Sequence, residues 1–163
     1  MDHSKTYFQP PDLPLIVKCK LEKNARLPYK VNAKAVGHDV YAYETKTLHP
    51  FIATKVSTGC AFEPPPGYYL RQIGVSQLVT VSNIHCTEGT LDSDFRGISQ
   101  VILENHNNRD VILPMGTRIA QIVLVTQPNW KVLPSVDLTP TDRGTRGFGE
   151  MDTATSSWTN ILE

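Results

Sequence analysis

Short runs of alternating hydrophobic and polar residues, separated by turn-forming residues, make up most of the chain. The alternation is typical of strands that are buried on one face. It predicts strands over residues 15–21 (regular from Val17 onward), 40–43, 47–48, 53–56, 68–73, 78–81, 100–103, 111–113 and 119–125. No window repeats apolar residues every 3.6 positions for longer than two turns, and residues 75–81 are the least clear assignment. Many short strands with turns between them predict an all-β sandwich or barrel.

The hydrophobic pattern also divides the chain of 163 residues, a length that suits one domain. Prolines gather near the end of residues 1–13, where we expect a loose N-terminal arm. Residues 14–136 carry the strand pattern and form the expected β-domain. From about residue 137 the apolar residues thin out, so we expect residues 137–163 to form a mobile C-terminal arm.

Charge and composition argue against several classes of protein. The formal net charge is zero, so there is no electrostatic case for nucleic acid, and we expect no direct contact with it. No apolar run approaches 18 residues, so we expect no membrane span. The N-terminal residues lack the apolar core of a signal peptide, and the three cysteines lack CxxC spacing. Both features favour an intracellular protein, cytoplasmic or nuclear, with free thiols. The five histidines show no paired spacing, so we expect no zinc site.

Residues 89–97 hold two carboxylates, an aromatic ring and an arginine between two glycines. Apolar residues flank the segment on both sides, which predicts a strand, a tight acidic hairpin and a second strand. In such a turn, Asp92 can activate a water beside the flat ring of Phe95. Taken alone, an ordinary polar hairpin is the simpler interpretation.

Two earlier segments carry polar groups with more than one interpretation. Asp39 follows a glycine turn and could order a metal-bound water, or it could cap the turn. Ser76 could donate a hydrogen bond to an anion, or it could be a solvated turn serine. A serine nucleophile is disfavoured, because Leu78 stands where the GxSxG elbow needs its second glycine.

Two later segments could also bind a ligand. On the strand over 119–125, Gln121 shares a face with Ile119, and it needs either a ligand or a structural polar partner. Strict alternation places Arg118 on the opposite face. In the C-terminal arm, Arg143 could clamp a phosphate and Phe148 could stack on a base. The alternative for the arm is an RGG-like nucleic-acid tail, which one repeat in a neutral chain supports weakly.

In their order and spacing, these five segments resemble the five motifs of the trimeric dUTP pyrophosphatases (dUTPases). The resemblance runs from about residue 14 to residue 149, and residues 91–97 carry it most specifically. It implies a jelly-roll-like β-barrel that forms a homotrimer, with each active site shared between chains. It also implies Mg²⁺-dependent hydrolysis of dUTP to dUMP and pyrophosphate, an activity that keeps uracil out of DNA.

The resemblance further implies a role for each matching residue. Asp92 matches the general base that activates the water attacking the α-phosphorus. Asp39 matches the carboxylate that holds Mg²⁺ through water. The substrate-binding positions are Gly89, Phe95, Gln100, Ser76, Gln77, Gln121, Arg143, Phe148 and Gly149. Gly89 would read the uracil edge, Phe95 would pack on the deoxyribose, and the last three would lie on an arm that closes over the nucleotide.

The second motif departs from the family, because Val75 and Gln77 stand where arginine and glycine are usual. A lost charged hydrogen bond to phosphate costs about 1.5–3 kcal/mol. An active but divergent dUTPase is the leading interpretation. The alternative is a catalytically impaired dUTPase-fold protein acting through protein–protein contact, as some viral members of the lineage do. dCTP deaminase shares the fold, but its catalytic glutamate would fall at Ile102, and Glu104 lies two residues further on.

Overall fold

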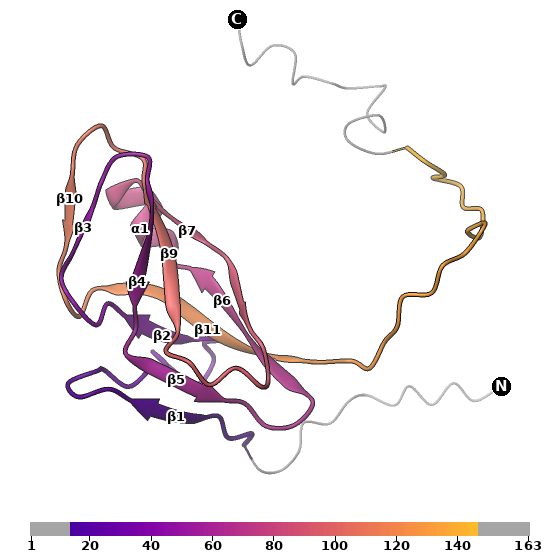
Figure 1. The fold of residues 1–163 in the computed structure, drawn as a ribbon, viewed down its shortest axis with the longest axis horizontal. Helices are drawn as coiled ribbons and strands as arrows, with labels where there is room; N and C mark the ends of the chain where they lie inside the picture. Colours follow the sequence, from indigo (N-terminus) through magenta and orange to yellow (C-terminus); the bar gives the residue numbers. More distant parts are fainter. Residues whose placement is uncertain (1–13, 147–163) are drawn as a thin grey trace, which may run out of the picture. The chain divides into compact units, whose positions relative to one another are not determined.

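The structure is a computed structural model that describes residues 14–146. The chain divides into two units, one ending at Pro128 and one beginning at Asn129. The described residues of the first unit, 14–128, form eleven strands and one helix, whose arrangement is drawn in Figure 1. The described residues of the second unit, 129–146, form no helix or strand. No helix in the described part of the chain is long and apolar enough to cross a membrane.

The strands form four antiparallel sheets, so the predicted all-β class is confirmed. The elements are β1 (Lys18–Leu21), β2 (His38–Tyr41), β3 (Lys46–Leu48), β4 (Ala53–Ser57), β5 (Cys60–Glu63), β6 (Tyr68–Gly74), α1 (Ser76–Ser82), β7 (Ile84–Thr87), β8 (Gly89–Leu91), β9 (Gln100–Asn105), β10 (Val111–Leu113) and β11 (Arg118–Thr126). The larger sheets have the strand orders β2-β11-β6-β8 and β4-β9-β7. Two pairs, β1-β5 and β3-β10, complete the fold.

The apolar side chains of these strands meet in one core, which explains the alternating pattern. In β9, Val101 and Leu103 are fully buried, whereas Gln100 at the start of the strand is exposed. The core continues into the other large sheet through Leu70 of β6 and Ile119 of β11. Burial of one strand face therefore drives sheet formation here, as the period of two predicts.

One predicted strand is wrong: residues 78–81 lie in the helix α1, not in a strand. The segment is rich in β-branched residues, which favour strands. Leu78 is the buried residue of the helix, while Val79 and Val81 are exposed. Asn83 ends the helix in the left-handed conformation, with φ 49°, and its N–H bonds to the carbonyls of the last turn. Packing of Leu78 and this cap outweigh the local strand propensity.

The predicted tight hairpin at residues 89–97 is also wrong in its connection. Strands β7 and β9 do pair, with Thr87 opposite Ile102. Between them, however, β8 leaves that sheet and pairs with β6, with Gly89 opposite Gln72. Residues 92–99 are therefore a loop that passes from one large sheet to the other.

Candidate active site

Polar side chains from three separate elements meet around Arg118 at the start of β11. Its Nη1 lies 3.2 Å from Asp39 Oδ2, and its Nη2 donates to Gln77 Oε1 at 3.0 Å. Asp39 is only 8% exposed, so the guanidinium balances a carboxylate that is largely removed from water. Arg118, from the segment that resembles the fourth motif, thus bonds both to Asp39 of the first motif and to Gln77 of the second.

A β-bulge in β11 determines which way Arg118 points. Arg118 pairs with Tyr41 of β2, yet Ala120 pairs with Val40, so one extra residue interrupts the alternation. That residue is Ile119, and both it and Ala120 are fully buried. The bulge therefore brings Arg118 to the Asp39 side of the sheet.

Gln121 also faces this side, because it pairs directly with Asp39 across β2 and β11. The sequence-based prediction that Gln121 shares a face with Ile119, opposite Arg118, is wrong because it assumed regular alternation. Gly37 makes room for the amide: a Cβ there would lie 2.5 Å from Gln121 Oε1. An amide, a carboxylate and a guanidinium on one side suit a phosphate with a hydrated cation.

The rest of the second motif splits between core and surface. Val75, which stands at the family's arginine position, is 7% exposed and belongs to the core. Ser76 is the exposed first residue of α1. The nearest arginine upstream, Arg71, forms an ion pair with Glu88 on the surface, and this hydrogen bond raises the pKa of Arg71. The exposed Gln77 is the second-motif side chain that joins the Arg118 cluster.

The loop that carries Asp92 is held by its own backbone and by Arg96. The Phe95 N–H donates to the Asp92 carbonyl at 3.1 Å, which forms a turn. Arg96 Nη1 donates to the carbonyls of Ser93 and Phe95, at 2.8 and 3.0 Å. The Asp92 side chain is exposed at the start of this turn, where its carboxylate can reach water. This geometry suits a general base.

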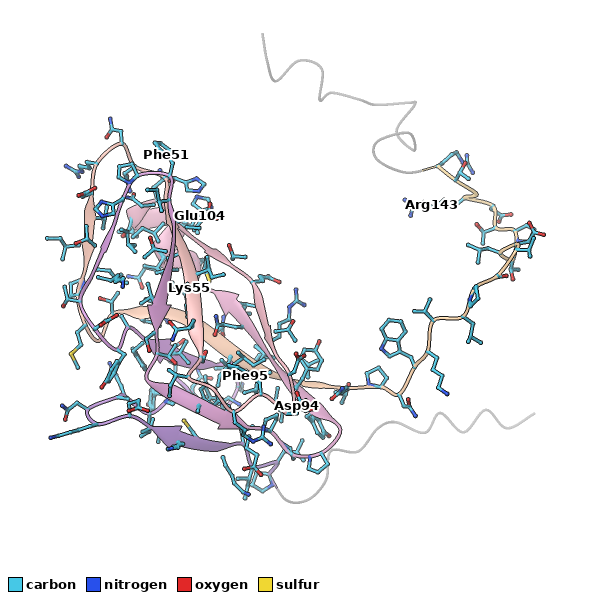
Figure 2. All side chains as sticks on the ribbon, in the orientation of Figure 1. Phe51, Lys55, Asp94, Phe95, Glu104 and Arg143 are labelled. Carbon is cyan, nitrogen blue, oxygen red and sulfur yellow. The ribbon has the colours of Figure 1, made fainter. Side chains whose placement is uncertain are left out.

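The ring of Phe95 lies over Gly97 and remains 45% exposed. A Cβ at Gly97 would lie 2.6 Å from Phe95 Cζ, so glycine lets the ring fold onto the loop. Figure 2 shows Phe95 and Asp94 together at the opposite end of β9 from Glu104. The ring can therefore present a flat apolar face beside Asp92.

Gly89 and Gln100 begin the strands on either side of this loop. A Cβ at Gly89 would meet only the Gln72 side chain, at 3.8 Å and 3.9 Å, which are ordinary contact distances. Packing within the described chain therefore does not demand glycine at this position, and an open backbone can be approached by a ligand. Gln100 is exposed, and it pairs with Ser57 of β4.

Comparison with known proteins identifies this set of motifs. The chain matches the dUTPase family over residues 23–151. It belongs to the dUTPase family. The deoxyuridine 5'-triphosphate nucleotidohydrolase of Yarrowia lipolytica is 35% identical over 131 residues, covering 79% of this chain and 83% of the relative. The enzyme of the same name from Hydrogenobaculum sp. is 37% identical over 141 residues, covering 83% and 95%.

Solved dUTPase structures share the fold of this family member. A point mutant of the Staphylococcus bacteriophage 80alpha dUTPase, with dUpNHpp, has a TM-score of 0.76 at 21% identity, covering 83% of this chain and 98% of that one. The predicted jelly-roll-like dUTPase fold is confirmed. A mutant dUTPase from phage phi11 of S. aureus aligns with a TM-score of 0.71 at 17% identity, covering 77% and 99%. That protein coordinates a structural Mg(II) ion.

The predicted site residues of this dUTPase-family chain fall into separate groups. Asp39 and Gln77 bond to Arg118, and Gln121 lies opposite Asp39 on the same side of the sheet. Gly89, Asp92, Phe95 and Gln100 lie in and beside the loop over 92–99. Among residues 14–146, no hydrogen bond or ion pair joins these two groups. Within the described chain, the two groups are therefore not linked by hydrogen bonds or ion pairs into one cluster.

The fifth motif lies in the second unit, and its described part is a turn. Arg143 Nε donates to the Arg146 carbonyl at 2.8 Å, and the Gly144 N–H donates to the Thr141 carbonyl at 3.0 Å. Gly144 has φ +58°, a conformation that favours glycine. Arg143 is exposed and is labelled in Figure 2. The predicted residues Phe148 and Gly149 lie outside the described residues.

The donor set fits a cation that water and substrate hold, rather than a caged metal. Within residues 14–146, no three His, Cys, Asp or Glu side chains are grouped as metal ligands. Asp39 offers one carboxylate, whose Oδ2 is bonded to Arg118. Mg²⁺ characteristically keeps several waters and uses one or two carboxylates with substrate phosphates. The residues present therefore fit Mg²⁺ bound through water.

Sequence reasoning missed two features of the site. Regular alternation predicts the wrong face for Arg118, although a charged residue at the start of an apolar strand is itself a sign of a polar partner. The alternating pattern also gives no sign of Gln72 and Ser99, which are both buried polar residues. A buried polar side chain needs hydrogen-bond partners, which makes such positions worth examining.

Proposed function

We propose that this chain hydrolyses dUTP to dUMP and pyrophosphate, with Mg²⁺ as cofactor, and that it works as a homotrimer with shared sites. Membership of the dUTPase family and the named activity of its relatives support dUTP as the substrate. The observation that carries the proposal is that Asp92 is exposed near Phe95, on the loop that connects the two large sheets.

In this proposal Asp92 accepts a proton from the water that attacks the α-phosphorus. Phe95 packs on the deoxyribose with its exposed face, and the open backbone at Gly89 accepts the uracil edge. Hydrolysis of this kind requires positioning and neutralisation of charge more than covalent catalysis. One well-placed carboxylate contributes about 10²–10⁴-fold as a general base.

The Asp39–Gln77–Arg118–Gln121 cluster would hold the triphosphate. Arg118 keeps a guanidinium in the cluster, although the usual second-motif arginine is replaced by the buried Val75. Asp39 would hold the waters of Mg²⁺, and the cation would neutralise phosphate charge. The separation of this cluster from the Asp92 loop within one chain agrees with sites that are completed by other copies.

The deciding experiment measures pyrophosphate release from dUTP, dCTP, dTTP and UTP, with Mg²⁺ and with EDTA. We expect release from dUTP alone, its loss with EDTA, and a fall of at least about 100-fold in Asp92→Asn. Asp110→Asn is the matched control, because this exposed carboxylate pairs with His49 away from the Asp92 loop. Full turnover in Asp92→Asn would remove Asp92 from the role of base.

The second candidate is an impaired dUTPase-fold protein that acts through protein–protein contact. The loss of the second-motif arginine to a core valine favours it. Absence of pyrophosphate release from a folded protein would support this candidate over hydrolysis.

Light scattering would test the homotrimer, which should have three times the chain mass of 18.2 kDa.

A further inference from the structure

One buried side chain, Gln72 of β6, connects the two large sheets beside the Asp92 loop. Gln72 is only 2% exposed. Its Nε2 donates to the Gln100 carbonyl at 3.0 Å, and its Oε1 accepts from Ser99 Oγ at 2.8 Å. Since β6 belongs to one large sheet and β9 to the other, this amide spans the interior between them.

The same residue also meets the other end of the segment that carries Asp92. Gln72 pairs with Gly89 in the β6–β8 ladder. A Cβ at Gly89 would lie 3.8 Å from Gln72 Nε2, so the amide lies directly beside this glycine. Gln72 therefore contacts both the start and the end of residues 89–100.

Ser99 carries the connection further into the fold. Its carbonyl accepts from Thr58 Oγ1 at 3.0 Å and from the Thr58 N–H at 3.1 Å, and its N–H donates to the Cys60 carbonyl at 2.8 Å. Thr58 and Ser99 are each 1% exposed. Hydrogen bonds of this kind fix geometry more narrowly than apolar contact, because they are directional.

We infer that Gln72 is a positioning residue for dUTP hydrolysis. Its backbone pairs with Gly89, which accepts the uracil edge, and its amide holds the end of the loop that presents Asp92, so that the two lie at a fixed distance. The inference rests on the proposed function, because it assigns roles to the two ends of this segment. Gln72 acts through Gly89, Ser99 and Gln100, and it does not itself touch the nucleotide.

Asn105 provides a comparison that separates positioning from stability. It lies at the other end of β9, is fully buried, and its Nδ2 donates at 2.8 Å to the carbonyls of Leu48 and Arg109. Both residues are thus buried amides with satisfied hydrogen bonds. Only Gln72 contacts the segment that carries Asp92.

The test compares Gln72→Met, Ser99→Ala and their double variant with Asn105→Ala. Gln72→Met keeps the length of the side chain and removes both hydrogen bonds. We expect its kcat for dUTP to fall about 10–100-fold, since small misplacements of reacting groups cost that much, while the KM changes less than kcat. Asn105→Ala should lose stability in urea while its kcat stays within about twofold of the original.

The double variant separates the two effects further. Gln72→Met alone leaves the buried Ser99 hydroxyl without its acceptor. The double variant removes that hydroxyl as well, so its urea midpoint should recover relative to Gln72→Met. The kcat should stay low, because β6 no longer holds the loop. Ser99→Ala alone is the milder variant if Gln72→Met does not fold, and it should show a smaller fall in kcat.

Amide hydrogen exchange of residues 89–100 gives a readout that does not need activity. Exchange should accelerate in Gln72→Met and remain unchanged in Asn105→Ala. Unchanged exchange and kcat in Gln72→Met, or an equal loss of kcat in Asn105→Ala, would overturn the inference. If the unsubstituted protein releases no pyrophosphate, the proposed function fails. The positioning role is then decided by amide hydrogen exchange together with the affinity for dUpNHpp.

Discussion

Val75 shows how the burial of a single side chain changes the meaning of a motif. At this position the family usually has an arginine, which could contact phosphate. Here the side chain packs in the core instead, at the start of α1. The guanidinium that remains near the cluster comes from Arg118, on another strand.

We predict that Val75→Arg destabilises the protein instead of restoring a phosphate contact. Burying an unpaired charge in the core should lower the free energy of unfolding by about 2–4 kcal/mol. Urea denaturation measures the change. Val79→Arg is the control, because Val79 lies exposed on the same helix and should change stability by less than about 0.5 kcal/mol. An unchanged midpoint for Val75→Arg would mean that residue 75 can reach solvent.

We predict that Gly37→Ala lowers activity by displacing Gln121. The added Cβ would lie 2.5 Å from Gln121 Oε1, the end of a flexible side chain, which must then move. The kcat/KM for dUTP should fall about tenfold, the value of one hydrogen bond to a charged group. In a Gln121→Ala background the same substitution should have a smaller effect, because the displaced amide is already absent and only the Ile122 carbonyl, 3.0 Å from the added Cβ, still has to be accommodated. An additive loss would indicate a different cause.

At the scale of elements, α1 depends on the cap that ends it. Asn83 holds a left-handed backbone, and its Nδ2 also donates to the His106 carbonyl at 2.9 Å. The His106 N–H in turn donates to the Asn83 carbonyl at 3.0 Å. These bonds fasten the helix to the loop after β9.

We predict that Asn83→Ala costs about 1–2 kcal/mol of unfolding free energy, from backbone strain and the lost side-chain bond. Asn24→Ala is the matched control, because Asn24 also has a positive φ, 68°, and is also exposed, but its side chain makes no hydrogen bond to a described residue. It should show the smaller loss, due to strain alone. Equal losses in urea denaturation would show that the Asn83 side-chain bond contributes nothing.

The β1–β5 pair should become less stable in alkaline solution. Burial, with Cys60 nearby, raises the pKa of Cys19 to about 12, above the ordinary thiol value of 9.0, and burial also raises the pKa of Cys60. The folded state therefore keeps thiol protons that the unfolded state loses. This stabilisation is complete below pH 9 and is lost as the pH rises towards 12. Urea midpoints should fall across this range, and Cys19→Ala should reduce the slope; an unchanged slope would exclude Cys19 as a cause.

The elements that could be predicted from sequence are those in which one face of a strand is buried. The alternation around Val101 and Leu103 locates β9, and similar patterns locate most of the other strands. Strand β5 escaped prediction because three consecutive residues, Cys60 to Phe62, are all buried, so no alternation appears. The helix α1 escaped because its single buried residue leaves no period to detect. Strand β8 crosses to the other large sheet because it pairs with β6, and local sequence patterns do not predict such long-range pairing.

For the whole molecule, the two units separate the sheets from the fifth motif. Every strand of the described chain ends by Thr126, and Arg143 lies in the second unit. The family motifs name the residues of the candidate site one by one, and these assignments stay predictions. The division of this site between the Arg118 cluster and the Asp92 loop could not be predicted, because it depends on sheet order and on the bulge.

We predict that deleting residues 140–163 abolishes turnover while leaving the urea midpoint unchanged. The deletion removes Arg143 and Phe148, the proposed contacts of the closing arm, and none of the described residues that it removes, 140–146, belongs to a sheet. Deleting only residues 152–163 is the control, because the family match ends at residue 151, and this variant should keep its activity. Pyrophosphate release and urea denaturation measure the two effects. A fully active 140–163 deletion would show that the arm takes no part in the reaction.

The bulge in β11 has a consequence for how relatives of this chain are aligned. Arg118 and Gln121 face the same side of the sheet although they are separated by an odd interval of three residues, which a regular strand forbids. Any relative that keeps this pair at this interval must keep the irregularity as well. A homologue that kept all four residues but formed a regular strand would turn its arginine away from the carboxylate, whereas loss of the bulged residue would leave an interval of two, which keeps arginine and glutamine on one face. A gap of one residue at Ile119 in an alignment is therefore compatible with an unchanged position of the arginine and should not be counted as the loss of this contact.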